Sequence, residues 1–267
     1  MKKTIITVLI ISILGTLILS ACGKKEAESQ VLKIGATPVP HSELLNLIKD
    51  DLKEQGIDLK IIEFTDYVKP NLALAEGEID ANFFQHVPYM ESFAENKGID
   101  IISLGTVHVE PLGVYSKDIK SIEDLKDGAS IAIPNDPTNG GRALILLENN
   151  GLIKLSEDSS LEATEKDIVE NPRNLKFKAL EAAQIPRVMG DVDAAIINGN
   201  YALEAELVPT EDAILLEDKD SPYANIIAIR PEDKDNTKLK TLLDTLQSEE
   251  VKKYIEENYN GGVIPAF

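Results

Sequence analysis

The stretch from Ile79 to Met90, IDANFFQHVPYM, constrains the fold more than any other part of the chain. Apolar and polar residues alternate at its start with the two-residue period of a pleated strand. Pro88 cannot donate a hydrogen bond to a sheet, so we expect the strand to end near Phe84. Phe84, His86 and Tyr89 would then lie together at its carboxyl end, where open α/β sheets bind ligands. The alternative is that these rings only fill the core, as large aromatic side chains usually do.

Two series of alternating strands and helices follow each other along the chain. The first has expected strands at 31–37, 57–64, 79–84 and 99–107, with helices at 41–55, 66–76 and 87–97. After a short strand at 111–116, the second has expected strands at 129–134, 175–180, 192–197 and 225–230, with helices at 138–149, 184–190 and 200–207. One long amphipathic helix is expected at 236–259, and the polar stretch 156–174 has no assigned structure.

Strand and helix units in series predict parallel pairing with right-handed crossovers, here in an α/β fold of two lobes with a ligand cleft between them. The chain would leave the first lobe near 108–116 and return near 225–232. We therefore expect residues 31–110 plus 230–267 to form lobe 1, with the last helix packed on it, and residues 111–229 to form lobe 2. The two crossings would also serve as the hinge.

The N-terminus predicts where the protein lies in the cell. Lys2 and Lys3 precede an apolar run and small residues, the three regions of a secretory signal peptide at 1–21. The segment LSAC that ends at Cys22 resembles a bacterial lipobox, in which cleavage precedes the cysteine and its thiol is lipidated. We therefore expect a cell-membrane protein that faces outward, anchored through a lipid on Cys22, with residues 22–30 as a flexible tether. A free thiol or an uncleaved membrane helix are the alternatives, although the apolar run is short for a spanning helix.

Composition excludes several kinds of partner and site. Cys22 is the only cysteine, so the chain can form neither an intramolecular disulfide nor a thiolate metal cluster. The chain has 46 acidic and 27 basic residues, and its net charge of -19 argues against binding to nucleic acid or to anionic lipid.

Two other classes of protein are alternatives. In an enzyme, His86, His108 and Glu110 could be zinc ligands, but their spacing is unsuitable and the chain lacks an H-E-x-x-H motif. The chain also lacks the G-x-S-x-G motif of serine hydrolases and the phosphate-binding P-loop motif. We therefore expect no catalytic residue, no metal and no cofactor. The second alternative is a surface lipoprotein for adhesion or sensing that binds a macromolecule, which the anchor and the acidic charge fit equally well.

Six motifs in order resemble the NlpA family of lipoproteins: IDANFFQHVPY, AIPNDPTNGGRAL, GLIKL, VENPRNLKF, QIPRVMGDVDAAIINGNYA and SPYANIIAIR. The resemblance begins near Val31 and covers nearly all of the chain after the tether. MetQ-type members of this family are the methionine-binding components of importers of the ATP-binding-cassette (ABC) class. The resemblance therefore implies a periplasmic-binding-protein-like fold whose two lobes close over one amino acid, with a membrane permease and an ATPase as partners.

The same resemblance implies which residues bind the ligand. The family's apolar cage for the thioether side chain corresponds to Tyr67, Phe84, His86 and Tyr89. Its carboxylate clamp corresponds to Arg142, and its amide contacts to the amino-acid head group correspond to Asn198 and Asn225. Many relatives carry a larger apolar residue at the position of Gly140, which implies a roomier head-group site here.

These residue types suit a free amino acid, which is a zwitterion whose two charges must both be paired when protein encloses it. Arg142 can hold a carboxylate through two parallel hydrogen bonds. Asn198 and Asn225 can accept from an ammonium group and donate to a carboxylate. Asp136 or Glu110 could supply a carboxylate for the ammonium group. L-Methionine is the expected ligand, and D-methionine, a methionine-containing dipeptide or another small apolar amino acid are the alternatives.

Overall fold

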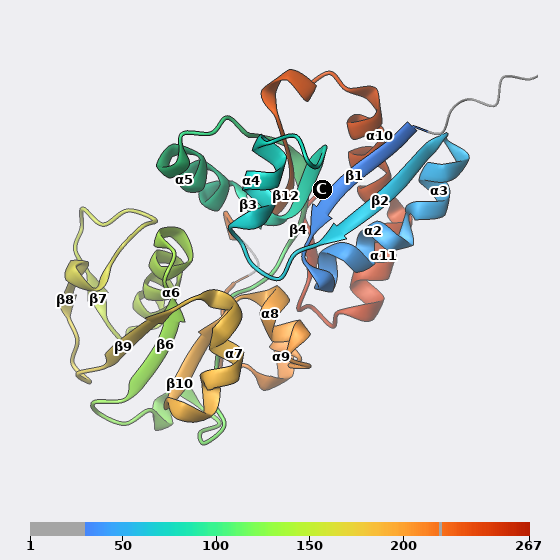
Figure 1. Ribbon diagram of the computed structural model, residues 1–267. Coiled ribbons are helices and arrows are strands. Elements are labelled where there is room, and N and C mark those ends of the chain that lie inside the picture. Colours follow the sequence, from blue (N-terminus) through green and yellow to red (C-terminus); the bar gives the residue numbers. More distant parts are fainter. Residues whose placement is uncertain (1–29, 219–220) are drawn as a thin grey trace, which may run out of the picture.

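The computed structural model describes residues 30–218 and 221–267, which form two lobes joined by two connecting segments (Figure 1). The predicted signal peptide, Cys22 and the tether up to Ser29 lie outside the described residues. Within the described ranges, the helices are all too short or too polar to cross a bilayer.

The first lobe is built on a six-stranded sheet with the strand order β13-β4-β12-β3-β1-β2. Its strands are β1 (Gln30–Ala36), β2 (Ile57–Glu63), β3 (Ala81–His86), β4 (Ile102–Val109), β12 (Ala224–Ile229) and β13 (Ile264–Pro265). β1 pairs in parallel with β2 and β3, as the repeated strand and helix units predict. β12 runs antiparallel between β3 and β4, so the chain returns to the first lobe before Ala224 and not at 230 as predicted. Its run of apolar residues indicates a buried strand but does not indicate which sheet buries it.

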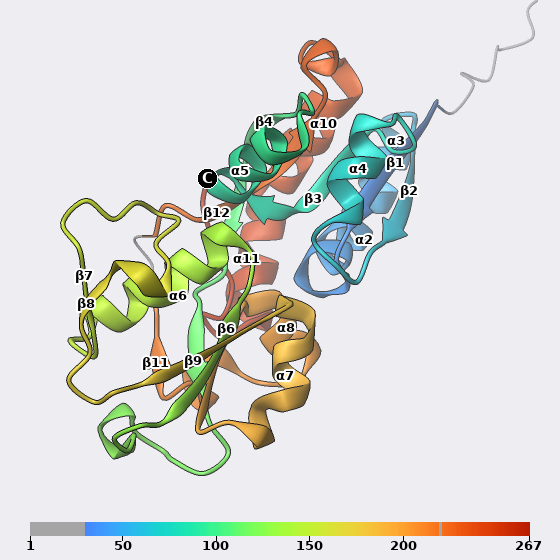
Figure 2. The same cartoon turned by 60° about the vertical axis from the view of Figure 1, so that its left-hand side comes forward.

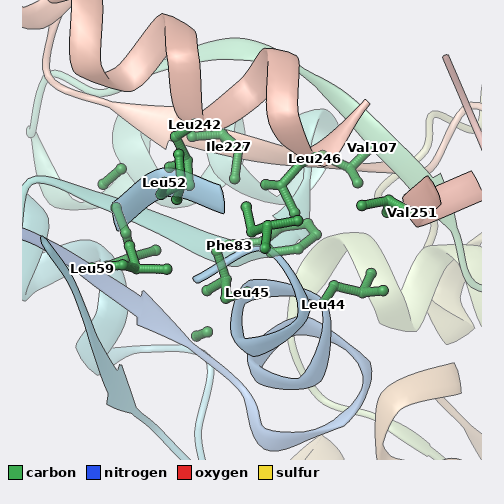
Figure 3. Packing of buried hydrophobic residues seen from close by; sticks show 14 of the residues in the cluster. Leu44, Leu45, Leu52, Leu59, Phe83, Val107, Ile227, Leu242, Leu246 and Val251 are labelled. Carbon is green, nitrogen blue, oxygen red and sulfur yellow. The ribbon is translucent and has the colours of Figure 1, made fainter. Parts of the chain in front are cut away.

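Helices cover both faces of this sheet. One face carries a short π-helix η1 (Pro38–Ser42), α2 (Glu43–Leu47), α3 (Lys49–Glu54), α10 (Thr237–Leu246) and α11 (Glu249–Asn258), and the other carries α4 (Lys69–Ala75) and α5 (Val87–Lys97). Figure 3 shows the first face, where Phe83 lies between leucines of α2 and α10. Successive residues of β12 face opposite ways, so Ile227 packs in this core while Ile226 packs beneath α4 and α5.

Two predicted helices are each broken into two. The predicted helix 41–55 is interrupted at Ile48, whose ψ of 2° is not helical. The predicted helix 236–259 ends at Leu246 and restarts at Glu249, because Ser248 accepts a hydrogen bond from the backbone N–H of Val251 and caps the second helix. Both halves pack on the first lobe.

The second lobe contains a five-stranded sheet with the order β11-β5-β10-β6-β9. Its strands are β5 (Gly113–Tyr115), β6 (Ser130–Pro134), β9 (Lys176–Leu180), β10 (Ala194–Ile197) and β11 (Leu215–Leu216). Its helices are α6 (Pro137–Asn149), α7 (Ile185–Val188), α8 (Gly199–Glu204) and α9 (Pro209–Asp212). The stretch without a predicted structure forms most of a two-stranded ribbon of β7 (Lys154–Leu155) and β8 (Ile168–Glu170). Single 3-10 turns are η2 (Ile122–Asp124), η3 (Glu165–Asp167), η4 (Ala182–Gln184), η5 (Met189–Asp191) and, on the return to lobe 1, η6 (Pro231–Asp233).

The two connecting segments run side by side between the lobes. The backbone N–H of Glu217 donates to the carbonyl of Leu112 at 2.9 Å, and the N–H of Leu112 donates to Glu217 Oε2 at 3.3 Å. β3 and β10 end where the two lobes face each other. Figure 2 shows α5 of the first lobe close to α6 of the second. The residues that follow these two strands therefore meet between the lobes.

Candidate ligand-binding site between the lobes

A narrow cavity lies between the lobes and is lined by residues of both. The first lobe contributes Tyr67, Phe84, Gln85, His86, Tyr89, Glu110 and Asn225, and the second contributes Asn139, Arg142, Asn198, Gly199 and Asn200. All seven residues predicted to bind the ligand line this one cavity, although they come from positions spread between 67 and 225. The other five are Gln85, Asn139, Gly199 and Asn200, which the sequence does not predict as ligand contacts, and Glu110, which it offers only as a partner for an ammonium group.

Four rings form one wall of the cavity. The ring of Tyr67 lies 5.8 Å from that of Phe84 and 5.7 Å from that of Tyr89, centroid to centroid. His86 follows in β3, which continues two residues beyond its predicted end because β12 pairs with Gln85 and His86. The Nδ1 of His86 accepts from the backbone N–H of Tyr89 and so caps α5. Burial and the nearby charge of Arg142 lower the pKa of His86 to about 3, so the ring is neutral at pH 7.

A neutral hydrogen-bond network of buried amide side chains fixes the position of the strand that carries Phe84 and His86. The Nε2 of Gln85 donates to Asn71 Oδ1 at 2.7 Å and to Asn82 Oδ1 at 2.9 Å, and Asn71 donates back to Gln85 Oε1 at 2.8 Å. Because these amides satisfy one another, they fix the end of β3 without a buried charge.

The amides of the second lobe present an acceptor to the cavity. Asn198 follows β10, and its Nδ2 donates to Asn139 Oδ1 at 2.8 Å. Asn139 in turn donates to the carboxylate of Asp136, which caps α6 and does not line the cavity. The Oδ1 of Asn198 is buried and has no hydrogen-bond partner among the described residues. A buried acceptor of this kind favours a ligand that donates a hydrogen bond.

Arg142 is buried on α6 and lines the cavity, but its fork already holds a carboxylate. Its Nε donates to Glu217 Oε1 at 3.0 Å and its Nη2 to Glu217 Oε2 at 2.5 Å. Nη2 also donates to the carbonyl of Glu110 at 2.8 Å, and the guanidinium lies 4.3 Å from the ring centroid of Tyr223. The predicted two-bond clamp on a ligand carboxylate stays a prediction, since Nε and Nη2 bond Glu217 here. Within the described residues, Nη1 is the one nitrogen of the fork without a protein partner, which leaves it for a ligand.

Glu110 supplies the anionic side of the cavity. It follows β4, and only 5% of the residue is exposed. A Cβ on Gly199 would lie 2.6 Å from the Cβ of Glu110, so only glycine lets α8 approach this side chain. Burial raises the pKa of Glu110, while His41, Arg142 and the backbone N–H of Asn200 oppose that effect. Of the two carboxylates considered for an ammonium group, Glu110 is the one that reaches the cavity.

The structure bears on two further points from the sequence, the zinc grouping that was argued against and the departure from the family pattern at Gly140. His108 and Glu110 lie beside His41 and not beside His86, which bonds to Asn139 across the lobes instead. Gly140 does not line the cavity, because it points from α6 toward the carbonyl of Pro134, which an added Cβ would approach to 3.0 Å. The absence of a side chain at Gly140 therefore does not enlarge the head-group site.

Two α/β lobes joined by paired segments, with an aromatic wall and charged groups of both lobes around one cavity, define the class of extracytoplasmic solute-binding proteins. The family model of the NlpA lipoproteins matches residues 32–267, and the chain belongs to this family.

Relatives in this family are similar over most of their length. The chain is 43% identical to the D-methionine-binding lipoprotein MetQ of Salmonella typhi. The aligned 256 residues cover 95% of this chain and 94% of the relative. A nutrient-binding protein of Burkholderia cenocepacia, solved bound to methionine, is 49% identical with a TM-score of 0.86 over 88% of this chain and all of the other. A periplasmic substrate-binding protein of an ABC transporter from Coxiella burnetii is 44% identical with a TM-score of 0.85 over the same shares.

Proposed function

We propose that this chain is the solute-binding component of a methionine importer of the ABC class. It encloses one methionine between its lobes and presents it to a membrane permease that an ATPase drives, and it catalyses no reaction. The observation that carries this proposal is the cavity itself, in which an aromatic wall of the first lobe faces charged and amide groups of both lobes. The names of the relatives from Salmonella and Burkholderia support methionine as the ligand.

Each part of methionine has a chemically suited partner in this proposal. The thioether has no strong hydrogen bond to satisfy and contacts aromatic rings favourably, by roughly 0.3–1.5 kcal/mol for each ring. The ammonium group pairs with Glu110 and donates to the Oδ1 of Asn198, to which no described residue donates. The carboxylate accepts from Arg142 Nη1 and from Asn225 Nδ2, since the Oδ1 of Asn225 already accepts from His41.

The lobes are the moving parts in the proposed cycle. Residues 30–109 with 224–267 form one body, residues 113–216 form the other, and the segments between them absorb the rotation. A ligand that touches both bodies stabilises the closed form, which the permease would recognise. The lipid on Cys22 would hold the protein at the outer face of the membrane, and the tether would let it reach the permease.

Calorimetric titration of the chain from Val31 onward tests this function. The protein is first unfolded and refolded to remove carried-over ligand, and then titrated with L-methionine, D-methionine and glycyl-methionine. Tight binding of L-methionine supports the proposal in full, and preference for D-methionine or the dipeptide keeps the fold and the role but changes the substrate. If none of the three binds, the adhesion or sensing alternative is favoured, and one zinc ion per chain after dialysis would favour an enzyme.

A further inference from the structure

A buried cluster of His41, His108 and Glu110 lies directly behind the cavity. Both histidines are at most 1% exposed, and their ligand-type atoms and that of Glu110 lie within 4.8 Å of one another. The Nε2 of His108 is 2.7 Å and the Nε2 of His41 is 3.3 Å from the same oxygen, Glu110 Oε1. Of the three, only Glu110 lines the cavity.

The partners of each ring determine which nitrogen carries the proton. His41 Nε2 also lies 3.1 Å from Asn225 Oδ1, and because both of its neighbours are acceptors, Nε2 is the donor. His41 Nδ1 then accepts from the hydroxyl of Thr37 at 2.7 Å. Beside an ionised Glu110, His108 Nε2 is likewise the donor, because a carboxylate oxygen can only accept. The Nδ1 of His108 has no hydrogen-bond partner among the described residues. Two neutral imidazole N–H groups therefore converge on one carboxylate oxygen.

The three groups differ in how burial affects their charge. Burial lowers the pKa of His41 to about 4 and that of His108 to about 3, so both rings are neutral at pH 7. Burial raises the pKa of Glu110, which accordingly depends on its hydrogen-bond donors to remain ionised. The cluster is therefore arranged to stabilise a carboxylate anion and not to bind a metal ion. The Nε2 of each histidine donates its proton to an oxygen acceptor and so has no lone pair for a metal.

We propose that His41 and His108 are positioning residues that favour the anionic form of Glu110 at the cavity, and that a ligand's ammonium group binds this form, so that any protonated Glu110 must lose its proton when the ligand is captured. This inference rests on the proposed binding of an amino acid. When Glu110 is protonated, its proton passes to solvent as the ammonium group binds. Affinity is therefore full above the pKa of Glu110 in the free protein and falls by up to about tenfold per pH unit below it.

Other charged groups also face Glu110 and must be separated from the effect. Arg142 on α6 favours its ionised form, whereas Glu204 on α8 is a like charge whose own pKa is raised to about 7 by burial and by its acidic neighbours. Tyr67 and Tyr259 are also close enough to interact with it, and burial raises the pKa of both phenols, so they stay neutral. Glu204 is therefore the one other group near Glu110 that titrates close to neutral pH.

The test is the pH dependence of L-methionine affinity between pH 4.5 and 8, by calorimetry, in wild type and in variants at His108 and Glu204. His108→Phe removes the N–H donor, and the fall in affinity should begin about one pH unit higher. His108→Gln keeps an N–H donor and should retain the wild-type profile more closely. The shift in His108→Phe should persist on a Glu204→Gln background. If all these proteins have the same pH profile, the histidines only fill space and the inference is wrong.

A second measurement on the ligand-free protein needs neither a variant nor methionine. ¹⁵N NMR of the histidine rings at pH 6 should show both His41 and His108 neutral with the proton on Nε2. A charged ring, or a proton on Nδ1 of either ring, would overturn the inference even if methionine binds. If methionine fails to bind while the NMR result is as expected, the proposed function is wrong, but the inference that the two histidines stabilise the Glu110 anion is retained.

Discussion

At the scale of single residues, Arg142 carries the clearest prediction. Arg142→Ala should weaken methionine binding, because the ligand carboxylate loses its cationic partner and Arg142 is buried. Truncating one member of a buried charge pair costs roughly 2–5 kcal/mol, so the dissociation constant should rise by at least about thirtyfold. Calorimetric titration with L-methionine measures this effect.

The same substitution also leaves Glu217 without its partner, so the fold of the variant must be checked. Arg142→Lys is the matched control, since it keeps a cation near Glu217 but cannot present three nitrogens in a plane. We expect Arg142→Lys to bind with intermediate affinity. Binding as tight as wild type in folded Arg142→Ala would show that the head-group site is assigned wrongly.

Glu217 is predicted to compete with the ligand for the guanidinium. Glu217→Gln should lower the free energy of unfolding by roughly 1–3 kcal/mol, less than for a fully buried pair because its side chain is 15% exposed. The freed nitrogens of Arg142 should also bind the ligand carboxylate more strongly. L-Methionine should therefore raise the melting temperature of Glu217→Gln more than that of wild type, and an equal or smaller rise would contradict the prediction.

The sequence predicts the cavity residues better than it predicts their partners. Phe84, His86 and Tyr89 are close together in the chain, so the period of the strand and one proline are enough to place them at its end. Glu217 is separated from Arg142 by 75 residues, and no local pattern indicates that the returning segment brings it back to α6. The role of His41 was missed for the same reason, because its contact with Asn225 spans 184 residues.

At the scale of elements, the start of α6 depends on Gly141. A Cβ at Gly141 would lie 2.1 Å from the carbonyl oxygen of Leu161 and 2.8 Å from the N of Ala163, both backbone atoms that cannot rotate away. Alanine is the better helix former by about 1 kcal/mol, but moving packed backbone costs roughly 1–3 kcal/mol. Gly141→Ala should therefore destabilise the protein and weaken methionine binding, since Arg142 is the next residue.

Denaturant unfolding and titration of Gly141→Ala measure both effects. Gly190→Ala is the matched control, because its new Cβ would meet only the flexible end of Lys117, with Nζ at 3.2 Å. Its free energy of unfolding should stay within about 0.5 kcal/mol of wild type. The packing argument fails if Gly141→Ala is as stable as this control.

Element boundaries were predicted less well than element types. The apolar spacing of the C-terminal helices continues across Gln247 and Ser248, so it predicts one long helix. The break arises from tertiary contacts, since Gln247 donates to the carbonyl of Thr106 at 2.8 Å while Ser248 caps α11. The position of β12 between β3 and β4 was missed for a similar reason, because a short apolar strand fits either sheet.

At the scale of the whole molecule, hydrogen bonds between the lobes determine how firmly the closed form is held. Tyr67 donates its hydroxyl to Asn200 Oδ1 at 2.5 Å, and His86 lies 3.3 Å from Asn139 Oδ1. Both pairs join residues that also line the cavity, so closing the lobes and completing the site are the same event. Weakening one of these bonds should therefore change how long the ligand stays bound.

Tyr67→Phe tests this coupling, because it removes the bond to Asn200 but keeps the ring in the aromatic wall. One neutral hydrogen bond contributes about 0.5–1.5 kcal/mol, so the dissociation rate of methionine should rise by roughly two- to tenfold. The association rate should change little, since the open form is unaffected. Stopped-flow measurement of both rates separates these effects.

Tyr115→Phe is the matched control for loss of a buried hydroxyl. The hydroxyl of Tyr115 lies inside the second lobe and has no hydrogen-bond partner among the described residues. Its removal should leave the dissociation rate unchanged and the protein equally stable or slightly more stable. If Tyr67→Phe releases methionine no faster than Tyr115→Phe does, the bond between Tyr67 and Asn200 does not hold the lobes closed, and closure must depend on the ligand and the charged groups around Arg142.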